Sequence, residues 1–227
     1  LVAETGATAV HCIRHYEPWW RNAERALKDR VTLIRHDGNY LLPPGSVRTG
    51  SGGEYKIYTP FWRALAQHMP PPAPLPVPSR IAAPDSWPES DNLGDWNLLP
   101  SKPDWAGGMA AMWTPGEAGA QERRADFIDQ ASQYDERRNL PSVEGTSFLS
   151  PHLHFGEISP YACWHATMRA GGSVEVFLKE LVWRDYAANV ITQFPDYGAR
   201  NAREGFDALP WRDVADPAVA ADLKAWQ

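Results

Sequence analysis

The sequence predicts an α/β segment followed by an all-helical segment, with a proline-rich connection between them. Three observations predict this order. Near the start, two short runs rich in β-branched residues flank a run of helical composition. A proline tract then occupies residues 69–78, and from about residue 114 cap-like residues precede helical stretches. The expected units are therefore residues 1–68, 69–113 and 114–227.

The first unit contains the predicted strands. Residues 8–13 and 31–34 have the length and the β-branched content of strands. Residues 18–29 between them have helical composition, with apolar residues at helical spacing. A strand–helix–strand order implies parallel strands. Because parallel sheets need more than two strands, we expect this unit to be the last part of a larger α/β domain.

The proline tract predicts the connection between the units. Each proline removes a backbone donor and fixes φ, so residues 69–78 cannot form a helix interior or a central strand. We expect a stiff, extended linker. A proline-rich ligand for a small recognition domain is the alternative for the same composition.

Cap-like residues predict the first two helices of the last unit. Thr114-Pro-Gly-Glu117 has the form of a capping box, and it would open a helix that ends near Tyr134. Ser159-Pro160 would open a second helix, which Gly171-Gly172 would end.

A third helix is expected from Val174 to about Phe194, capped by Ser173. Helical spacing groups several functional side chains near one face of it. These are Phe177, Glu180, Trp183 and Arg184. The opposite positions, toward the core, are Leu178, Leu181 and Val182. The first face offers a hydrogen-bond acceptor, a stacking surface and a phosphate contact, or alternatively an internal Glu180–Arg184 ion pair with Trp183 packed nearby.

Charge and cysteine content narrow the class of protein. A formal net charge of −6 argues against a protein that coats nucleic acid through global charge, although a local basic groove stays possible. Cys12 and Cys163 lack the spacing of metal ligands, and His152 and His154 have no acidic or cysteine cluster beside them, so no metal site is expected. No apolar run approaches the ~20 residues of a membrane span. We expect a cytoplasmic protein without a membrane segment.

A cluster of hydroxyl residues lies between the first two predicted helices. Thr146, Ser147 and Ser150 stand where one helix has ended and another starts. Hydroxyls and backbone N–H groups at such a junction suit a phosphate or pyrophosphate. Helix capping is the alternative for the same residues.

Taken together, these motifs resemble those of the DNA photolyase/cryptochrome family. The matching segments, in the family's order and spacing, are Tyr134, Arg137–Pro141, Glu144–Pro151, Phe155–Pro160 and Glu180–Tyr186. Glu17-Pro18 and Tyr58–Phe61 look like the back part of the family's antenna domain. The resemblance implies a truncated Rossmann-like parallel-sheet antenna domain, a proline-rich linker, and the first half of a helical domain that binds flavin adenine dinucleotide (FAD). It looks closest to a class I type photolyase for cyclobutane pyrimidine dimers, present as a partial chain.

The resemblance also implies roles by position. FAD contacts are expected at Tyr134, Thr146, Ser147, Phe148, Leu149, Ser150 and Arg184. Glu180 would hydrogen-bond a flipped pyrimidine dimer and Trp183 would stack against it, and the expected DNA contacts are Glu180, Trp183, Arg184 and Tyr186. Trp211 would be the outermost tryptophan of an electron-transfer chain to the flavin.

The implied function is light-dependent DNA repair. Excited reduced FAD would donate an electron to a flipped-out pyrimidine dimer in UV-damaged DNA. A second chromophore of the folate or deazaflavin type is a further expectation, as is a monomeric full-length protein. The piece 1–227 alone is expected to be inactive. The alternatives are a cryptochrome-type blue-light photoreceptor and a lyase for the (6-4) photoproduct.

Overall fold

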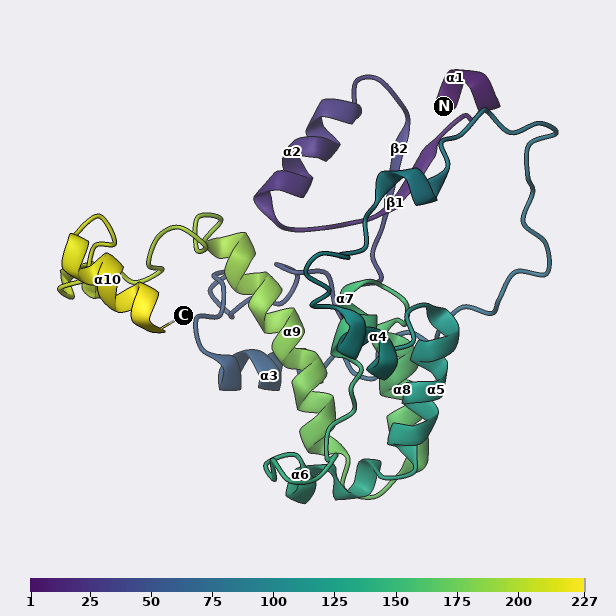
Figure 1. The fold of residues 1–227 in the computed structure, drawn as a ribbon. Helices are drawn as coiled ribbons and strands as arrows, with labels where there is room; N and C mark the ends of the chain where they lie inside the picture. Colours follow the sequence, from purple (N-terminus) through teal and green to yellow (C-terminus); the bar gives the residue numbers. More distant parts are fainter. Residues whose placement is uncertain (227) are drawn as a thin grey trace.

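The computed structural model describes residues 1–226 and contains two parallel strands and a set of helices (Figure 1). Strands β1 (Val10–Ile13) and β2 (Leu33–His36) pair in register from Val10–Leu33 to Ile13–His36, and α2 (Pro18–Leu27) connects them. The predicted parallel strand–helix–strand unit is therefore confirmed. Pro18 opens α2 after an extended Glu17, a place where its fixed φ fits the first helical turn.

The remaining elements are helical. The long ones are α5 (Glu117–Ile128), α8 (Pro160–Ala170), α9 (Glu175–Gln193) and α10 (Pro217–Trp226). The short ones are α1 (Val2–Thr5), α3 (Tyr58–Ala66), α4 (Gly107–Met112), α6 (Tyr134–Arg137), α7 (Ser150–His154) and the 3-10 turns η1 (Leu93–Trp96), η2 (Ala131–Gln133) and η3 (Glu204–Ala208). The α/β plus all-α class expected from the sequence is confirmed.

Helix α9 is the centre of the helical body. It contacts α3, α6 and α8, and α5 packs beside α8 (Figure 1). Leu178, Leu181 and Val182 of α9 are buried as predicted. The same core also takes in residues that precede the linker, namely Leu41, Val47, Phe61 and Leu65. The N-terminal unit is thus tied to the helical body through the segment after β2, while the boundaries 1–68, 69–113 and 114–227 stay a prediction.

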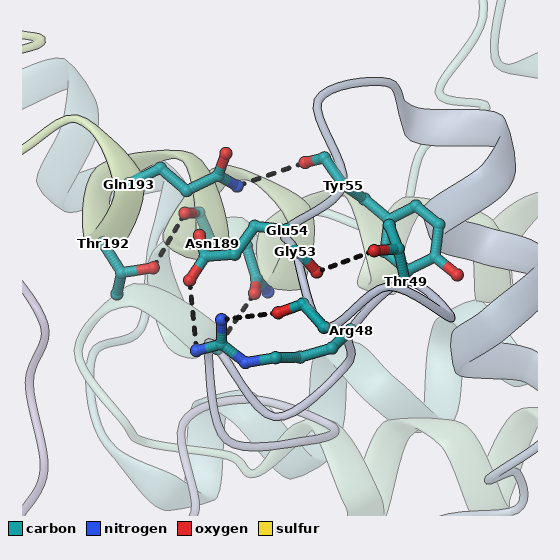
Figure 2. A network of polar contacts seen from close by, with 10 residues as sticks. Arg48, Thr49, Gly53, Glu54, Tyr55, Asn189, Thr192 and Gln193 are labelled. Carbon is teal, nitrogen blue, oxygen red and sulfur yellow. Dashed lines mark hydrogen bonds and ion pairs between the residues drawn. The ribbon is translucent and has the colours of Figure 1, made fainter.

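Three polar side chains of α9 hold the segment that follows β2. The buried Asp185 carboxylate accepts hydrogen bonds from the backbone N–H groups of Leu41 (3.2 Å) and Leu42 (2.9 Å). Asn189, one turn later, accepts from the N–H of Gly45 at 2.8 Å. At the end of the helix, Gln193 donates to the carbonyl of Tyr55 at 3.1 Å (Figure 2). The bonds to Asp185 and Asn189 satisfy loop N–H groups, and the bond from Gln193 satisfies a loop carbonyl, all of which packing would otherwise leave unpaired.

Asp185 predicts a pH dependence of stability. Burial raises the pKa of its carboxyl from 3.8 to about 7, against the opposing effect of the Leu42 and Leu41 N–H groups. The folded state therefore binds a proton that the unfolded state has lost, and this contribution to stability declines as the pH rises from about 4 to about 7. We expect the difference in thermal midpoint between the wild-type full-length protein and Asp185→Asn to shrink over this range. A difference that grows with pH would show that Asp185 is ionised in the folded protein.

The proline tract is extended, as predicted. Residues 67–92 contain no helix or strand, and Figure 1 shows this segment running as a long loop outside the helical body. One fixed point lies at its start, where His165 of α8 lies 2.8 Å from the carbonyl oxygen of Pro71. Among residues 1–226, no helix is long and apolar enough to cross a membrane.

The prediction for the first long helix was wrong at both ends. Thr114 does not cap α5, which begins at Glu117 after Gly116 with φ 101°. The Thr114 carbonyl instead lies against the first turn of the helix, so closely that a Cβ on Gly119 would lie 1.9 Å from its oxygen. The helix ends at Ile128, because the backbone leaves the helical region at Gln130 (φ −120°, ψ 6°).

The second helix follows the prediction, whereas the third differs in two details. Ser159 caps α8 by accepting from the N–H of Ala162 at 3.1 Å, and glycines of positive φ follow its end. Ser173 does not cap α9, whose N-cap residue is Val174 without a side-chain bond. Phe177 was expected on the accessible face, but it is buried because it packs against Phe127, with ring centroids 4.4 Å apart.

Candidate functional site

Glu180 and Trp183 lie one turn apart on the accessible side of α9. The side chain of Glu180 is 35% exposed and that of Trp183 is 43% exposed. The Oε1 atom of Glu180 accepts a hydrogen bond from Arg138, which follows α6. Among residues 1–226 the second oxygen, Oε2, accepts no hydrogen bond. The carboxylate is therefore held by one oxygen and available through the other.

Tyr134 and Arg138 form the wall next to Glu180. The guanidinium of Arg138 lies 5.3 Å from the centre of the Tyr134 ring. That ring packs edge-on against Phe127 and Phe177, so most of Tyr134 is buried. Burial raises the pKa of the Tyr134 hydroxyl, and Arg138 opposes the shift. Tyr134 and Glu180, assigned to different functions by sequence, are thus linked through Arg138.

Two aromatic rings pack against Trp183. Tyr58 of α3 stacks face to face on its indole, with ring centroids 3.5 Å apart and an angle of 5° between the planes. Tyr186 meets both rings edge-on, at 5.7 Å from Trp183 and 5.8 Å from Tyr58. The hydroxyl of Tyr58 donates to the carbonyl of Lys179 at 2.9 Å, which fixes its ring against α9. One face of the indole is therefore covered by protein.

The stack on Tyr58 predicts a measurable effect. Offset-stacked and edge-to-face aromatic pairs contribute about 0.5–1.5 kcal/mol beyond area burial, and Tyr58 meets Tyr186 edge-on in addition to its stack on Trp183. We expect Tyr58→Leu to lower the free energy of unfolding of the full-length protein, measured by urea denaturation, by about 0.5–1.5 kcal/mol relative to Tyr58→Phe, because Trp183 loses the ring stacked on it. Tyr58→Phe keeps the stack and is the matched control. Equal losses in both variants would assign the effect to the hydroxyl instead.

Arg184 is more buried than Glu180 and Trp183. Its guanidinium donates to the backbone carbonyls of Asn39 and Leu153, both at 3.1 Å. Burial lowers its pKa, against the opposing effect of Asp185. Arg184 also lines a cavity of about 360 Å³ that Tyr16, Glu17 and Ser150 share. These contacts tie the segment after β2 to α7, and the FAD and DNA contacts expected of Arg184 stay predictions.

The hydroxyl segment forms a tight loop before α7. Gly145 is required at its start, because a Cβ there would lie 2.3 Å from the Arg137 carbonyl oxygen. Thr146 and Ser150 are exposed, and Ser147 accepts from the N–H of Leu149 at 3.3 Å. Among residues 1–226 the backbone N–H groups of positions 146–148 donate no hydrogen bond.

The side chains of this loop divide between the surface and the core. Leu149 is buried in the hydrophobic core. Phe148 adopts a positive φ of 52°, and its ring lies 5.9 Å from that of Trp113. The guanidinium of Arg123 lies 5.5 Å from the Phe148 ring centre and borders a cavity of about 30 Å³ with Thr146. The loop hydroxyls therefore share this small cavity with Arg123 of α5 and with the carboxylates Asp126 and Glu144.

Trp211 lies apart from α9. It is 66% exposed, and its indole N–H donates to the Phe206 carbonyl at 2.8 Å. Among residues 1–226 no aromatic contact joins it to Trp183 or Tyr186. Its electron-transfer role stays a prediction. Within the same residues no group of three or more His, Cys, Asp or Glu side chains is arranged to hold a metal ion.

Sequence reasoning did not select Arg138 or Tyr58. Both lie inside matched segments, Arg137–Pro141 and Tyr58–Phe61, so the signal was present in the motifs. Their partners on α9 lie 42 and 121 residues away along the chain. No local spacing could have indicated these contacts.

The fold is an α/β unit joined to a helical body, and comparisons with known proteins give its family. The family model described as DNA photolyase matches residues 1–79. The deoxyribodipyrimidine photo-lyase of Agrobacterium fabrum is 44% identical over 237 residues, covering 100% of this chain and 48% of that protein. The corresponding protein of Synechococcus is 32% identical over 235 residues, covering 94% of this chain and 48% of that protein.

Solved structures similar to this chain are also photolyases and cryptochromes. The crystal structure of a class III photolyase from Agrobacterium tumefaciens has a TM-score of 0.88 and 41% identity, covering 99% of this chain and 48% of that one. The crystal structure of the Synechocystis cryptochrome has a TM-score of 0.64 and 19% identity, and the match covers 93% of this chain and 47% of that one. At this identity the likeness shows the fold alone. The chain belongs to the DNA photolyase/cryptochrome family. It spans about half the length of the relatives it matches.

Proposed function

We propose that the parent protein is a light-dependent DNA lyase that splits cyclobutane pyrimidine dimers. The observation that carries this proposal is the pair on α9, in which a carboxylate with one available oxygen lies one turn from a partly exposed indole. A lesion extruded from the duplex needs a hydrogen-bond acceptor for its base edges and an aromatic surface for its rings. A photoreceptor that signals through a protein partner needs neither.

The loop before α7 fits one side of FAD. Phosphates need several donors at once, and this loop offers the N–H groups of residues 146–148, the hydroxyls of Thr146 and Ser147, and the nearby guanidinium of Arg123. The cavity there, about 30 Å³, is far too small to enclose a dinucleotide, so these residues supply a single wall. When bound, reduced FAD would supply the light-driven electron that splits the lesion.

The chain's own residues would bind and orient the lesion. Oε2 of Glu180 would accept a hydrogen bond from a pyrimidine, while Arg138 holds the carboxylate through its other oxygen. Trp183, held from behind by Tyr58, would stack on the lesion with its accessible face. Tyr186 supports both rings edge-on.

The subclass and the second chromophore are also proposals. The sequence motifs suggested class I, which stays a prediction. The 41% identity to the class III photolyase of Agrobacterium tumefaciens over 99% of the chain supports class III instead. A folate- or deazaflavin-type chromophore stays an expectation without an assigned site.

Illumination of the full-length, FAD-loaded protein tests the proposal. The substrate is DNA with one cyclobutane pyrimidine dimer, and the readout is the fraction returned to monomers under blue light. We expect repair in the light and none in the dark. Absence of repair with reduced flavin bound contradicts a cyclobutane lyase. In that case repair of a (6-4) photoproduct, or no DNA repair at all, would favour the corresponding alternative.

A further inference from the structure

A further cavity lies away from Glu180 and Trp183, between α2, the residues that follow β1, β2 and the loop that α9 holds. Its volume is about 450 Å³, within the ~300–1,000 Å³ of small-molecule sites. Arg35 of β2, Thr192 of α9 and Gly45 of the loop all contribute to its walls. The cationic residues that line it are Arg14, Arg21, Arg25, Lys28, Arg35 and Arg48.

Positive charge is in excess in this cavity. Six cationic side chains line it, against the two carboxylates Glu24 and Glu54. Both carboxylates are already paired, Glu24 with Arg35 at 3.2 Å and Glu54 with Arg48 at 3.3 Å. Arg14 pairs with Asp37, which does not line the cavity, at 3.6 Å. The excess is local, because the whole chain carries a formal net charge of −6. Like charges gathered in one cavity repel one another, so a bound anion would stabilise this part of the fold.

Helix α2 supplies the cations that no carboxylate neutralises. Arg21, Arg25 and Lys28 are spaced four and three residues apart, so they share one side of the helix, the side that borders the cavity. Among residues 1–226 none of the three pairs with a carboxylate. Repeated like charges at this spacing destabilise a helix in the absence of a partner.

The opposite wall is held in place by α9. Figure 2 shows the loop around Arg48 beside Asn189, Thr192 and Gln193. Arg48 donates to the Gly52 carbonyl at 3.4 Å and pairs with Glu54, and Gln193 fixes the nearby Tyr55 carbonyl at 3.1 Å. The wall that faces α2 is thus fixed by contacts that do not depend on a ligand.

We propose that this cavity binds a small phosphate-bearing molecule with two or more negative charges. Five of its six cations are arginines, whose planar guanidinium matches phosphate oxygens in pairs. The cations converge on one cavity from a helix, a sheet and a loop, which suits a compact anion better than the extended backbone of a duplex. The site is independent of Glu180 and Trp183, so the proposal goes beyond the lyase function.

Binding of inorganic pyrophosphate to the full-length protein tests the proposal. By titration calorimetry at fixed salt concentration we expect a Kd below about 1 mM and a rise in thermal midpoint. Arg21→Gln/Arg25→Gln/Lys28→Gln should weaken binding by about tenfold or more, because it removes the unpaired cations. Arg21→Gln alone should weaken it less. The matched control, with the same change in net charge at exposed positions outside the cavity, is Arg80→Gln/Lys102→Gln/Arg169→Gln.

Two results would overturn the proposal. One is the absence of a specific site. It would be seen as no pyrophosphate binding by the wild-type protein, or as equal weakening in the cavity variant and the control variant, and equal weakening would leave only a general effect of net charge. The other is a cavity variant that binds pyrophosphate normally but loses affinity for undamaged duplex DNA, which would place these cations on a DNA-binding surface. Light-dependent repair is measured separately, so failure of the lyase proposal does not affect this outcome.

Discussion

Trp183→Ala should weaken binding of DNA containing a pyrimidine dimer by about 5- to 150-fold, because stacking of a base on an aromatic ring contributes ~1–3 kcal/mol. Trp183 can contribute fully because Tyr58 covers its other face at 3.5 Å and prevents it from turning away. Affinity for undamaged DNA should hardly change, since the lesion alone is expected to leave the duplex and reach the indole. Fluorescence anisotropy with labelled duplexes measures both affinities.

The matched control for this substitution is Trp87→Ala. Trp87 lies in the extended linker and is 74% exposed, so its removal takes away an indole without disturbing packing. A loss of affinity for damaged DNA that is equal in the two variants would rule out a stacking role for Trp183. An equal loss of affinity for damaged and undamaged DNA in Trp183→Ala would also rule out this role.

Glu180→Ala should lower the yield of light-dependent repair by about tenfold or more while FAD stays bound. Removal of the carboxylate deletes the hydrogen bond that the lesion would donate to a charged acceptor, which contributes ~1.5–3 kcal/mol. It also leaves Arg138 without its partner. The repair yield per absorbed photon and the flavin absorbance of the purified full-length protein are the two readouts. A flavin-free Glu180→Ala protein would contradict the assignment of Glu180 to the lesion and place it in the cofactor site.

Glu175→Gln is the control on the same helix. Glu175 pairs with Lys179 at 2.7 Å on an exposed surface, where such pairs contribute only ~0.3–0.5 kcal/mol. Repair by this variant should equal that of the wild type. A drop as large as that of Glu180→Ala would indicate a general effect of negative charge on α9.

The sequence allowed the order of the elements to be predicted well. The strands and α2 follow from β-branched runs around a helical one, and α8 follows from Ser159-Pro160 and the glycines at its end. These signals involve only a few neighbouring residues, so they can be recognised without knowledge of the tertiary structure. The predicted start of α5 failed because the Thr114 carbonyl lies against the first turn at Gly119, while the helix itself begins at Glu117 after Gly116 with positive φ.

The candidate site was only half predictable. Glu180 and Trp183 were found because helical spacing places them together, but the same spacing put Phe177 on that face. Phe177 is buried instead, since α5 and α6 bring Phe127 and Tyr134 against it. Arg138 and Tyr58 contact α9 from segments that are distant in the sequence. The Arg184 guanidinium donates to two backbone carbonyls. Contacts of this kind depend on how helices pack, which the sequence alone does not give.

The central claim is that the accessible face of α9 receives a pyrimidine dimer flipped out of the duplex. Fluorescence of 2-aminopurine placed opposite the dimer measures this step directly, because the probe brightens when its partner leaves the stack. We expect the wild-type full-length protein to raise the fluorescence in the dark and Trp183→Ala to abolish most of that rise at saturating protein. An unchanged rise in Trp183→Ala would contradict the claim.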